Sequence, residues 1–228
     1  MNADTWGPET WGVVLLSLQV GGAAMAATLP LAFALAYLLA RATFPGRLLV
    51  DALVHLPLVV PPVVTGWVLL LAFAPRGPFG ALSAFVLFRW TGAAIAAGVM
   101  ALPLMVRAIR LSIEAVDRRL EQAAQTLGAG RWRVFATITL PLSLPGVLAA
   151  AVLGFARALG EFGATITFVS NVPGETETLP LAIYAALQLP GGDARVLGLS
   201  LISVALSFAA LVASELLARR AGRGLHVL

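Results

Sequence analysis

Cysteine and lysine are both absent from this chain of 228 residues. Without cysteine the chain forms no disulfide and offers no thiolate to a metal ion, and its two histidines are too few for a zinc site. Without lysine it cannot build the phosphate-binding loop of nucleotide hydrolases, in which a lysine reaches the nucleotide phosphates. Any ATP hydrolysis that drives this protein must therefore take place in another chain.

Charge is scarce as well, because only 11% of the residues are charged whereas 60% are hydrophobic. Five long runs contain no charged residue, at positions 10–40, 52–75, 90–106, 134–156 and 196–214. At 1.5 Å per helical residue, the first run is long enough to cross a hydrocarbon core of about 30 Å. The composition predicts an all-α membrane protein, for which five spans are the simplest count.

The distribution of arginine predicts the orientation of these spans, because cationic residues gather in short cytoplasmic loops. Arginines stand at 41 and 47, at six positions between 107 and 133, and at 219, 220 and 223. The opposite segments have an acidic excess, contributed by Asp4, Glu9, Glu175, Glu177 and Asp193. We therefore expect the N-terminus outside and the C-terminus inside, and no interaction with nucleic acid.

The segment 178–192 is apolar but short, with Pro180 near its start and Pro190 near its end. We expect a helix that lies at the outer membrane interface. A sixth span is the alternative, but it would place the last three arginines outside and so conflict with the charge pattern.

A charged, amphipathic segment separates the third and fourth apolar runs. Small or apolar side chains recur in it at steps of three and four (Ile113, Val116, Leu120, Ala123, Ala124 and Leu127), and polar side chains fill the other face. The two alanines allow another protein to approach closely, and Gly128 suits the left-handed conformation that ends a helix. The pattern predicts a short docking helix, a hinge at 128–130 and a second short helix.

The spacing Ala123-Ala124-x3-Gly128-x9-Ile138-x-Leu140-Pro141 resembles the cytoplasmic coupling loop of permease subunits in binding-protein-dependent ABC importers. Further motifs at 44–46, 55–62, 103–110 and 160–168 resemble the molybdate permease subunit most closely. The resemblance extends from about position 15 to 217. It implies the MetI-like permease architecture, with a single transmembrane domain over 1–228 and a coupling loop at about 112–138.

The same resemblance implies which residues couple transport to ATP hydrolysis, namely Glu121, Gln122, Ala123, Ala124, Gly128, Ile138, Leu140 and Pro141. Related permeases favour glutamate six positions before the glycine, where this chain has Gln122, and the acid stands one position earlier at Glu121. The sequence leaves open which of these two side chains makes the polar contact.

Molybdate translocation across the bacterial inner membrane is the function that the resemblance implies. The implied partners are a second copy of the chain, a cytosolic ABC ATPase dimer that binds ATP and Mg²⁺, a periplasmic oxyanion-binding protein and membrane lipid. The chain itself would hold no cofactor and catalyse no reaction. A sulfate, thiosulfate or tungstate permease is the alternative within the family. An ion-gradient-driven secondary transporter is a more distant alternative, but the sequence shows no inverted repeats. An intramembrane enzyme would need catalytic residues that the sequence does not offer.

Two charged residues stand out near the end of the fourth apolar run. Arg157 and Glu161 are four residues apart, hence on one helix face, and each would be costly alone in hydrocarbon. We expect a continuous helix from Pro141 to Val169 with this pair in its outer half. The pair either lines the translocation pathway or holds helices together.

Hydroxyl groups are further candidates for the pathway. An oxyanion must be released after it has passed, and neutral donors bind it less tightly than fixed positive charges do. Thr65, Thr165 and Thr167 could supply such donors. Threonine in a membrane helix more commonly bonds to a carbonyl of its own helix, which is the alternative.

Overall fold

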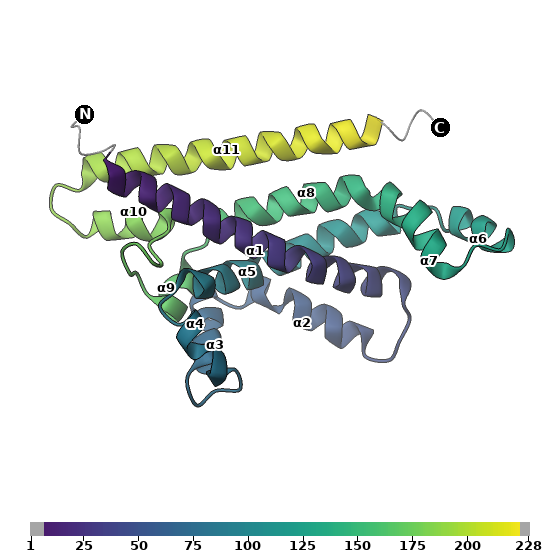
Figure 1. Cartoon of the computed structure of the whole chain (residues 1–228), viewed down its shortest axis with the longest axis horizontal. Coiled ribbons are helices and arrows are strands. Elements are labelled where there is room, and N and C mark those ends of the chain that lie inside the picture. The colour runs from purple at the N-terminus through teal and green to yellow at the C-terminus, as the bar shows by residue number, and fades with distance from the viewer. Residues whose placement is uncertain (1–6, 224–228) are drawn as a thin grey trace.

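The computed structural model describes residues 7–223, and every regular element in this part of the chain is a helix. The long helices α1 (Pro8–Arg41), α5 (Trp90–Glu114) and α11 (Asp193–Arg223) run along the molecule (Figure 1). A fourth long helix consists of α7 (Arg131–Val134), a π-helical turn η3 (Phe135–Thr139) and α8 (Leu140–Leu159). All four are long and apolar enough to cross a membrane, which confirms the predicted fold class.

The second predicted span, 52–75, is not one continuous helix. α2 (Arg47–Val59) and α3 (Pro62–Phe73) meet at 115° across Val60 and Pro61. Pro61 lacks the N–H that would continue the hydrogen bonding of α2 after Val60, and a proline disfavours the helical conformation in the residue before it. Residues 7–223 therefore contain four continuous candidate spans, or five if the bent pair counts as one.

The chain also breaks after α8. This helix ends at Leu159, and the short helix α9 (Gly163–Val169) follows as a separate element. The prediction of one continuous helix from Pro141 to Val169 is therefore wrong. A 3-10 turn η2 (Gly80–Leu82) and α4 (Ser83–Val86) connect α3 to α5.

α10 (Leu179–Leu187) occupies the segment that the sequence predicts to be a short helix. Its nine residues span only about 13 Å, too little to cross a hydrocarbon core. Leu179 and Ala182 pack with Val13 of α1 and Leu199 of α11. The short helix is confirmed, while its place at the outer interface stays a prediction.

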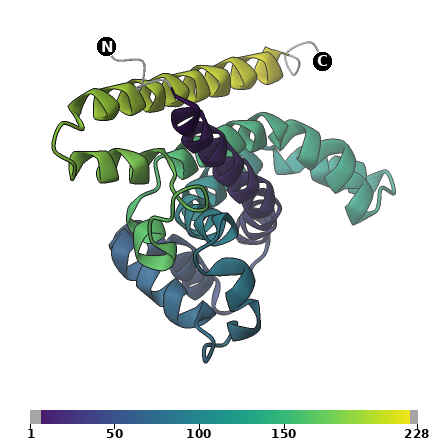
Figure 2. The ribbon, with the colours of Figure 1, turned by 60° about the vertical axis from the view of Figure 1, so that its left-hand side comes forward.

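Small side chains let the central helices pack closely. α1 lies against α5 (Figure 2), and the two helices contribute Ala24, Ala32, Ala36, Ala93, Ala97 and Ala101 to the buried core. Small residues allow close approach of helix backbones in a membrane, where lipid provides no hydrophobic driving force. α8 packs against α5 as well, so α5 is at the centre of the molecule.

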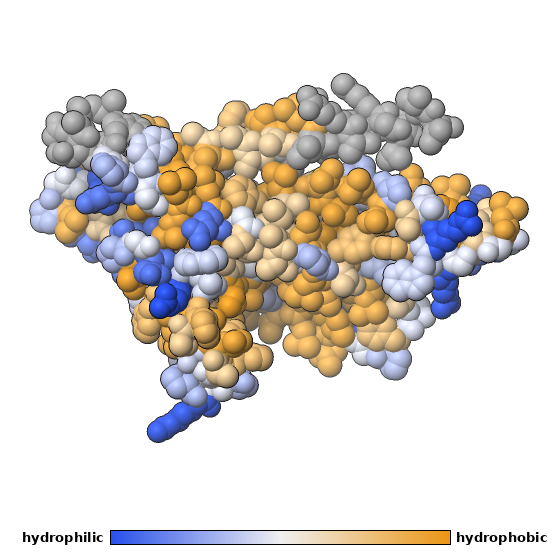
Figure 3. Space-filling model, viewed as in Figure 1, coloured by the Kyte–Doolittle hydropathy of each residue, from blue (hydrophilic) through white to orange (hydrophobic). Residues whose placement is uncertain are grey.

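The face of the molecule drawn in Figure 3 is mostly apolar along its middle, and polar residues gather toward the two ends. In the most apolar stretch of α11 only 17% of the residues are buried, whereas 67% are buried in the corresponding stretch of α5. Leu197, Leu201 and Phe208 are among the large side chains that α11 exposes. A continuous apolar surface of this kind is suited to lipid or to a protein partner.

The charged groups that the sequence assigns to opposite sides of the membrane lie at opposite ends of α1. Glu9, in the first turn, lies 3.8 Å from Arg195 of α11, while Arg41 ends the helix. Asp4 and the side chains of Arg219, Arg220 and Arg223, which also enter the predicted orientation, lie outside the described part of the structure.

Candidate coupling surface and translocation route

The predicted docking helix is α6 (Arg118–Thr126), which has its own start and stop signals. The Oδ1 atom of Asp117 accepts the N–H of Arg119 at 2.9 Å and caps the first turn. After the last turn, Gly128 has φ +87°, a left-handed conformation that glycine adopts without steric strain. α7 begins at Arg131, so the predicted break after the docking helix is confirmed, but the second helix is not short because α7 continues through η3 into α8.

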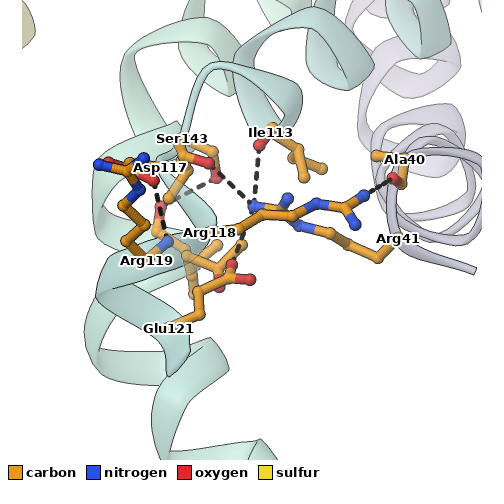
Figure 4. A network of polar contacts seen from close by, with 11 residues as sticks. Ala40, Arg41, Ile113, Asp117, Arg118, Arg119, Glu121 and Ser143 are labelled. Carbon is orange, nitrogen blue, oxygen red and sulfur yellow. Dashed lines mark hydrogen bonds and ion pairs between the residues drawn. The ribbon is translucent and has the colours of Figure 1, made fainter. Parts of the chain in front are cut away.

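A helix of nine residues is marginal by itself, and a polar network fixes α6 to the end of α1 (Figure 4). The Oε1 atom of Glu121 accepts hydrogen bonds from Arg41 Nη2 at 2.9 Å and from Thr139 Oγ1 at 2.7 Å. Arg118 Nη2 donates to the carbonyl of Ala40 at 3.3 Å. The side chains of Arg41 and Glu121 are only 12% and 15% exposed, so the ion pair is weakly screened by solvent.

The opposite face of α6 is exposed and partly apolar. Leu120 is 50% exposed and Leu127 is 88% exposed, and Ala123 between them is exposed as well, whereas Ala124 is half-buried. Apolar side chains on one face of an exposed helix are typical of a surface that another protein covers.

Glu121 and Gln122 have different surroundings in the structure. The acid is bonded inside the chain to Arg41 and Thr139, whereas Gln122 is exposed. Glu121 therefore holds α6 against α1, and the coupling role of either side chain stays a prediction.

Several residues of the predicted coupling pattern do not belong to the exposed face. Ile113 and Val116 are 0% and 6% exposed, because α5 continues to Glu114 and both side chains pack inside the chain. Including them in the docking face is therefore wrong. Ile138 lies in the π-helical turn, and Leu140 and Pro141 begin α8, so these three positions are part of the fourth long helix.

Arg41, Arg118 and Thr139 position α6, yet sequence reasoning does not identify them as its partners. Arg41 and Glu121 are separated by 80 positions, and no local pattern connects them. The available signal is weak: Arg41 is the first charge after the longest apolar run.

Arg157 and Glu161 form an ion pair across the break between α8 and α9. Arg157 Nη1 lies 2.7 Å from Glu161 Oε2, and Glu161 Oε1 accepts the N–H of Ala164 at 2.9 Å. The Glu161 side chain is 2% exposed and that of Arg157 is 32% exposed. One carboxylate thus satisfies an arginine and an N–H in the first turn of α9, which favours the interpretation of the pair as a joint between helices.

The predicted pathway threonines gather where α3 and α9 meet. A Cβ atom on Gly66 would lie 2.4 Å from the carbonyl oxygen of Ala164, so the two backbones touch. Thr65 precedes this contact, and Thr165 and Thr167 follow it on α9. Thr165 is 2% exposed, and Thr167 donates to a carbonyl of its own helix at 2.9 Å, the common behaviour of such hydroxyls.

The fold and the class of the protein follow from comparison with known proteins. Residues 28–223 match the family described as the binding-protein-dependent transport system inner membrane component. The structure is similar to that of a bacterial ABC transporter involved in alginate import, with a TM-score of 0.76 and 19% identity over 96% of this chain and 84% of that one. The chain belongs to the inner-membrane components of binding-protein-dependent transport systems.

Two relatives with known transport systems show how similar the sequence is to individual members of this family. The chain is 56% identical over 225 residues to the molybdenum transport system permease protein ModB of Escherichia coli K12, covering 95% of this chain and 98% of that protein. It is 39% identical over 158 residues to the sulfate transport system permease protein CysT of the same organism, covering 68% of this chain and 57% of that protein. A second structure of the alginate transporter is a complex with a periplasmic protein, and matches with a TM-score of 0.73 and 19% identity over 94% of this chain and 80% of that one.

Proposed function

We propose that this chain is the permease subunit of an ATP-driven importer that translocates molybdate across the inner membrane. The assignment of molybdate as the substrate rests on the 56% identity to a molybdenum permease over nearly the whole of that protein. The sulfate relative is less similar and is matched over only 57% of its length, so sulfate or thiosulfate is the second candidate. Tungstate fits as well as molybdate, because the two ions have nearly the same size and charge.

In this proposal the exposed face of α6 docks on a cytosolic ABC ATPase, which binds ATP and Mg²⁺. The face offers the small side chain of Ala123 between Leu120 and Leu127, with Gln122 beside it. Because Arg41 bonds to Glu121, a displacement of α6 is passed directly to α1, the longest helix. Two copies of the chain would enclose the pathway, and a periplasmic oxyanion-binding protein would deliver the ion, as the complex of the alginate transporter suggests by analogy.

The proposed route for the ion passes the contact between α3 and α9. The hydroxyls of Thr65, Thr165 and Thr167 supply neutral donors there, and Arg157 supplies a positive charge that Glu161 offsets. Replacing Thr65 and Thr165 together with valine should lower uptake, whereas Thr43→Val, at an exposed position in the loop after α1, should leave uptake unchanged. Unchanged uptake in the double variant would show that Thr65 and Thr165 do not contribute to the translocation route.

The decisive experiment for the proposed function is uptake of labelled molybdate into proteoliposomes that contain this chain, its ATPase and its binding protein. Uptake that requires all three proteins and resists excess sulfate is the expected result. Strong competition by sulfate would assign the chain to sulfate import, and uptake without the ATPase would contradict the coupling role of α6.

A further inference from the structure

A pocket of about 1030 Å³ opens between the end of α1 and the helices α6 and α7. One of its walls is aromatic. The ring centroids of Tyr37 and Phe135 are 5.3 Å apart, and those of Phe33 and Trp132 lie 6.0 and 6.2 Å from Phe135. Trp132 is 84% exposed, so this wall presents a large apolar surface that no described residue covers.

Another wall of the same pocket is basic. Arg41, Arg118 and Arg131 line it, and Glu121 is the one acid among the described lining residues, which leaves a net charge of three minus one, or +2. The hydrogen bonds of Arg41 to Ile113, Val116 and Glu121, and that of Arg118 to Ala40, all come from one Nη2 atom of each side chain. A guanidinium has five N–H donors, so this wall retains donors for an anion.

The pocket lies where α1 leaves the apolar part of the molecule. Leu38, which also lines the pocket, is 40% exposed, and Arg41 ends the helix three residues later. The distribution of arginines places this end on the cytoplasmic side, where the membrane leaflet carries anionic lipids. Aromatic rings with arginines beside them are suited to the boundary between acyl chains and headgroups.

We propose that this pocket binds an anionic phospholipid of the inner leaflet. Its phosphate meets the arginines, and its glycerol and upper acyl chains lie against the aromatic wall. A free oxyanion would use the arginines but leave the aromatic wall bare in a pocket much larger than the ion. The inference is independent of the transported ion and so goes beyond the proposed function.

The bound lipid would support α6 without blocking its exposed face. Arg118, Glu121, Gln122 and Gln125 line the pocket, whereas Leu120, Ala123 and Leu127 do not and lie at the spacing of another face of the helix. Lipid and ATPase therefore bind to adjoining faces of the same helix, with Gln122 at the border between them.

The test uses the assembled transporter in nanodiscs, with the fluorescence of Trp132 as the readout. Phosphatidylglycerol or phosphatidylcholine, brominated high in the acyl chains, serves as the quencher, and Trp132→Phe identifies the part of the signal that comes from the pocket. We expect brominated phosphatidylglycerol to quench this part more strongly than brominated phosphatidylcholine at equal lipid fraction.

Matched arginine variants sharpen the test. Arg118→Gln with Arg131→Gln should lower the relative affinity for the anionic lipid roughly 30-fold, equivalent to ~1 kcal/mol for each arginine. Arg76→Gln with Arg89→Gln removes two exposed arginines outside the pocket and should leave the preference unchanged. Equal quenching by the two lipids, or none because protein covers the pocket, would overturn the proposal. Loss of the preference in excess molybdate would also overturn it, since the arginines would then bind a free oxyanion.

Discussion

Two arginine–glutamate pairs hold two distinct parts of this molecule, and they differ in sequence distance and in burial. Arg41 and Glu121 are 80 positions apart, 2.9 Å from each other and 12% and 15% exposed. Arg157 and Glu161 are four positions apart, and the Glu161 side chain is only 2% exposed. The first pair ties a short polar helix to a long membrane helix, whereas the second bridges a break between two consecutive helices.

The two pairs differ in how well water can solvate the charge that remains when one partner is removed. Water can reach the polar end of the molecule, so a single charge at Glu121 or Arg41 can be partly solvated. The carboxylate of Glu161 is enclosed, whereas Arg157 is 32% exposed, and the cost of leaving the enclosed carboxylate unpaired is high. We therefore expect the buried pair to dominate stability and the long-range pair to dominate communication between α6 and α1.

The largest effect is expected for Glu161→Ala. The substitution leaves Arg157 without its partner and the N–H of Ala164 without its acceptor. Breaking a buried ion pair by removing one partner costs up to ~3–5 kcal/mol, and the loss here should lie toward the lower end of that range because the remaining Arg157 is 32% exposed. Thermal unfolding in detergent should show a large loss of stability, and uptake should be abolished.

Glu161→Gln is the matched control for this prediction. The amide oxygen can still accept the N–H of Ala164 but no longer carries the charge that pairs with Arg157. Its stability should fall between those of the wild type and Glu161→Ala. If the alanine variant unfolded at the wild-type temperature, the joint between α8 and α9 would not depend on this carboxylate.

A smaller loss of stability, but a loss of coupling, is expected for Arg41→Met. The substitution keeps an unbranched apolar stem and removes the hydrogen bonds to Glu121 and to the carbonyls of Ile113 and Val116. Hydrogen bonds to charged groups contribute ~1.5–3 kcal/mol. Hydrogen exchange of the amides in α6 should accelerate, and ATP hydrolysis by the assembled transporter should continue with less uptake per ATP.

A double-mutant cycle with Glu121→Gln isolates the contribution of this pair. If the two side chains act through each other, the double variant should lose less than the sum of the single losses. Strict additivity would show that Arg41 acts through its other contacts, the carbonyls of Ile113 at 3.0 Å and Val116 at 3.4 Å.

The contrast between the pairs also shows which parts of the structure are accessible from sequence. Charge-free runs predict the long helices, and the spacing of four predicts the Arg157–Glu161 pair, because both are local patterns. The angle between α2 and α3 is local in origin as well, since Pro61 and Pro62 mark it, although membrane helices can tolerate proline.

The rest depends on contacts between distant segments. The close contact between Gly66 of α3 and Ala164 of α9 joins two segments that are far apart in sequence, and no pattern within one helix reveals it. Likewise, Glu121 has two neighbours with opposite charge nearby in sequence, Arg118 and Arg119, yet its partner is Arg41 on another helix. Such pairings require the packing of α1 against α5 to be known first.

A moderate effect is expected for Gly66→Ala, which tests the close contact beside the buried pair. The added Cβ would lie 2.4 Å from the carbonyl oxygen of Ala164, so α3 and α9 must separate. Overpacking of this kind typically costs ~1–3 kcal/mol, and uptake should fall with it. Gly22→Ala is the control, because a Cβ at that helical position meets nothing within 4 Å; equal unfolding temperatures for the two variants would contradict the contact.

The smallest effect on global stability is expected for Gly128→Ala, at the end of α6. Gly128 has φ +87° and an added Cβ has open space around it, so the penalty of ~1–2 kcal/mol comes from the backbone conformation alone. Gly130→Ala is a close control, since that residue has an equally open environment and φ −66°. Only the first variant should weaken co-purification of the ATPase, and Gly128→Glu should weaken it further because it adds a charge beside the exposed face. If both alanine variants retained the ATPase equally, the ion pair with Arg41 would be sufficient to hold α6 in its docking position, and the long-range pair would be the main determinant of coupling.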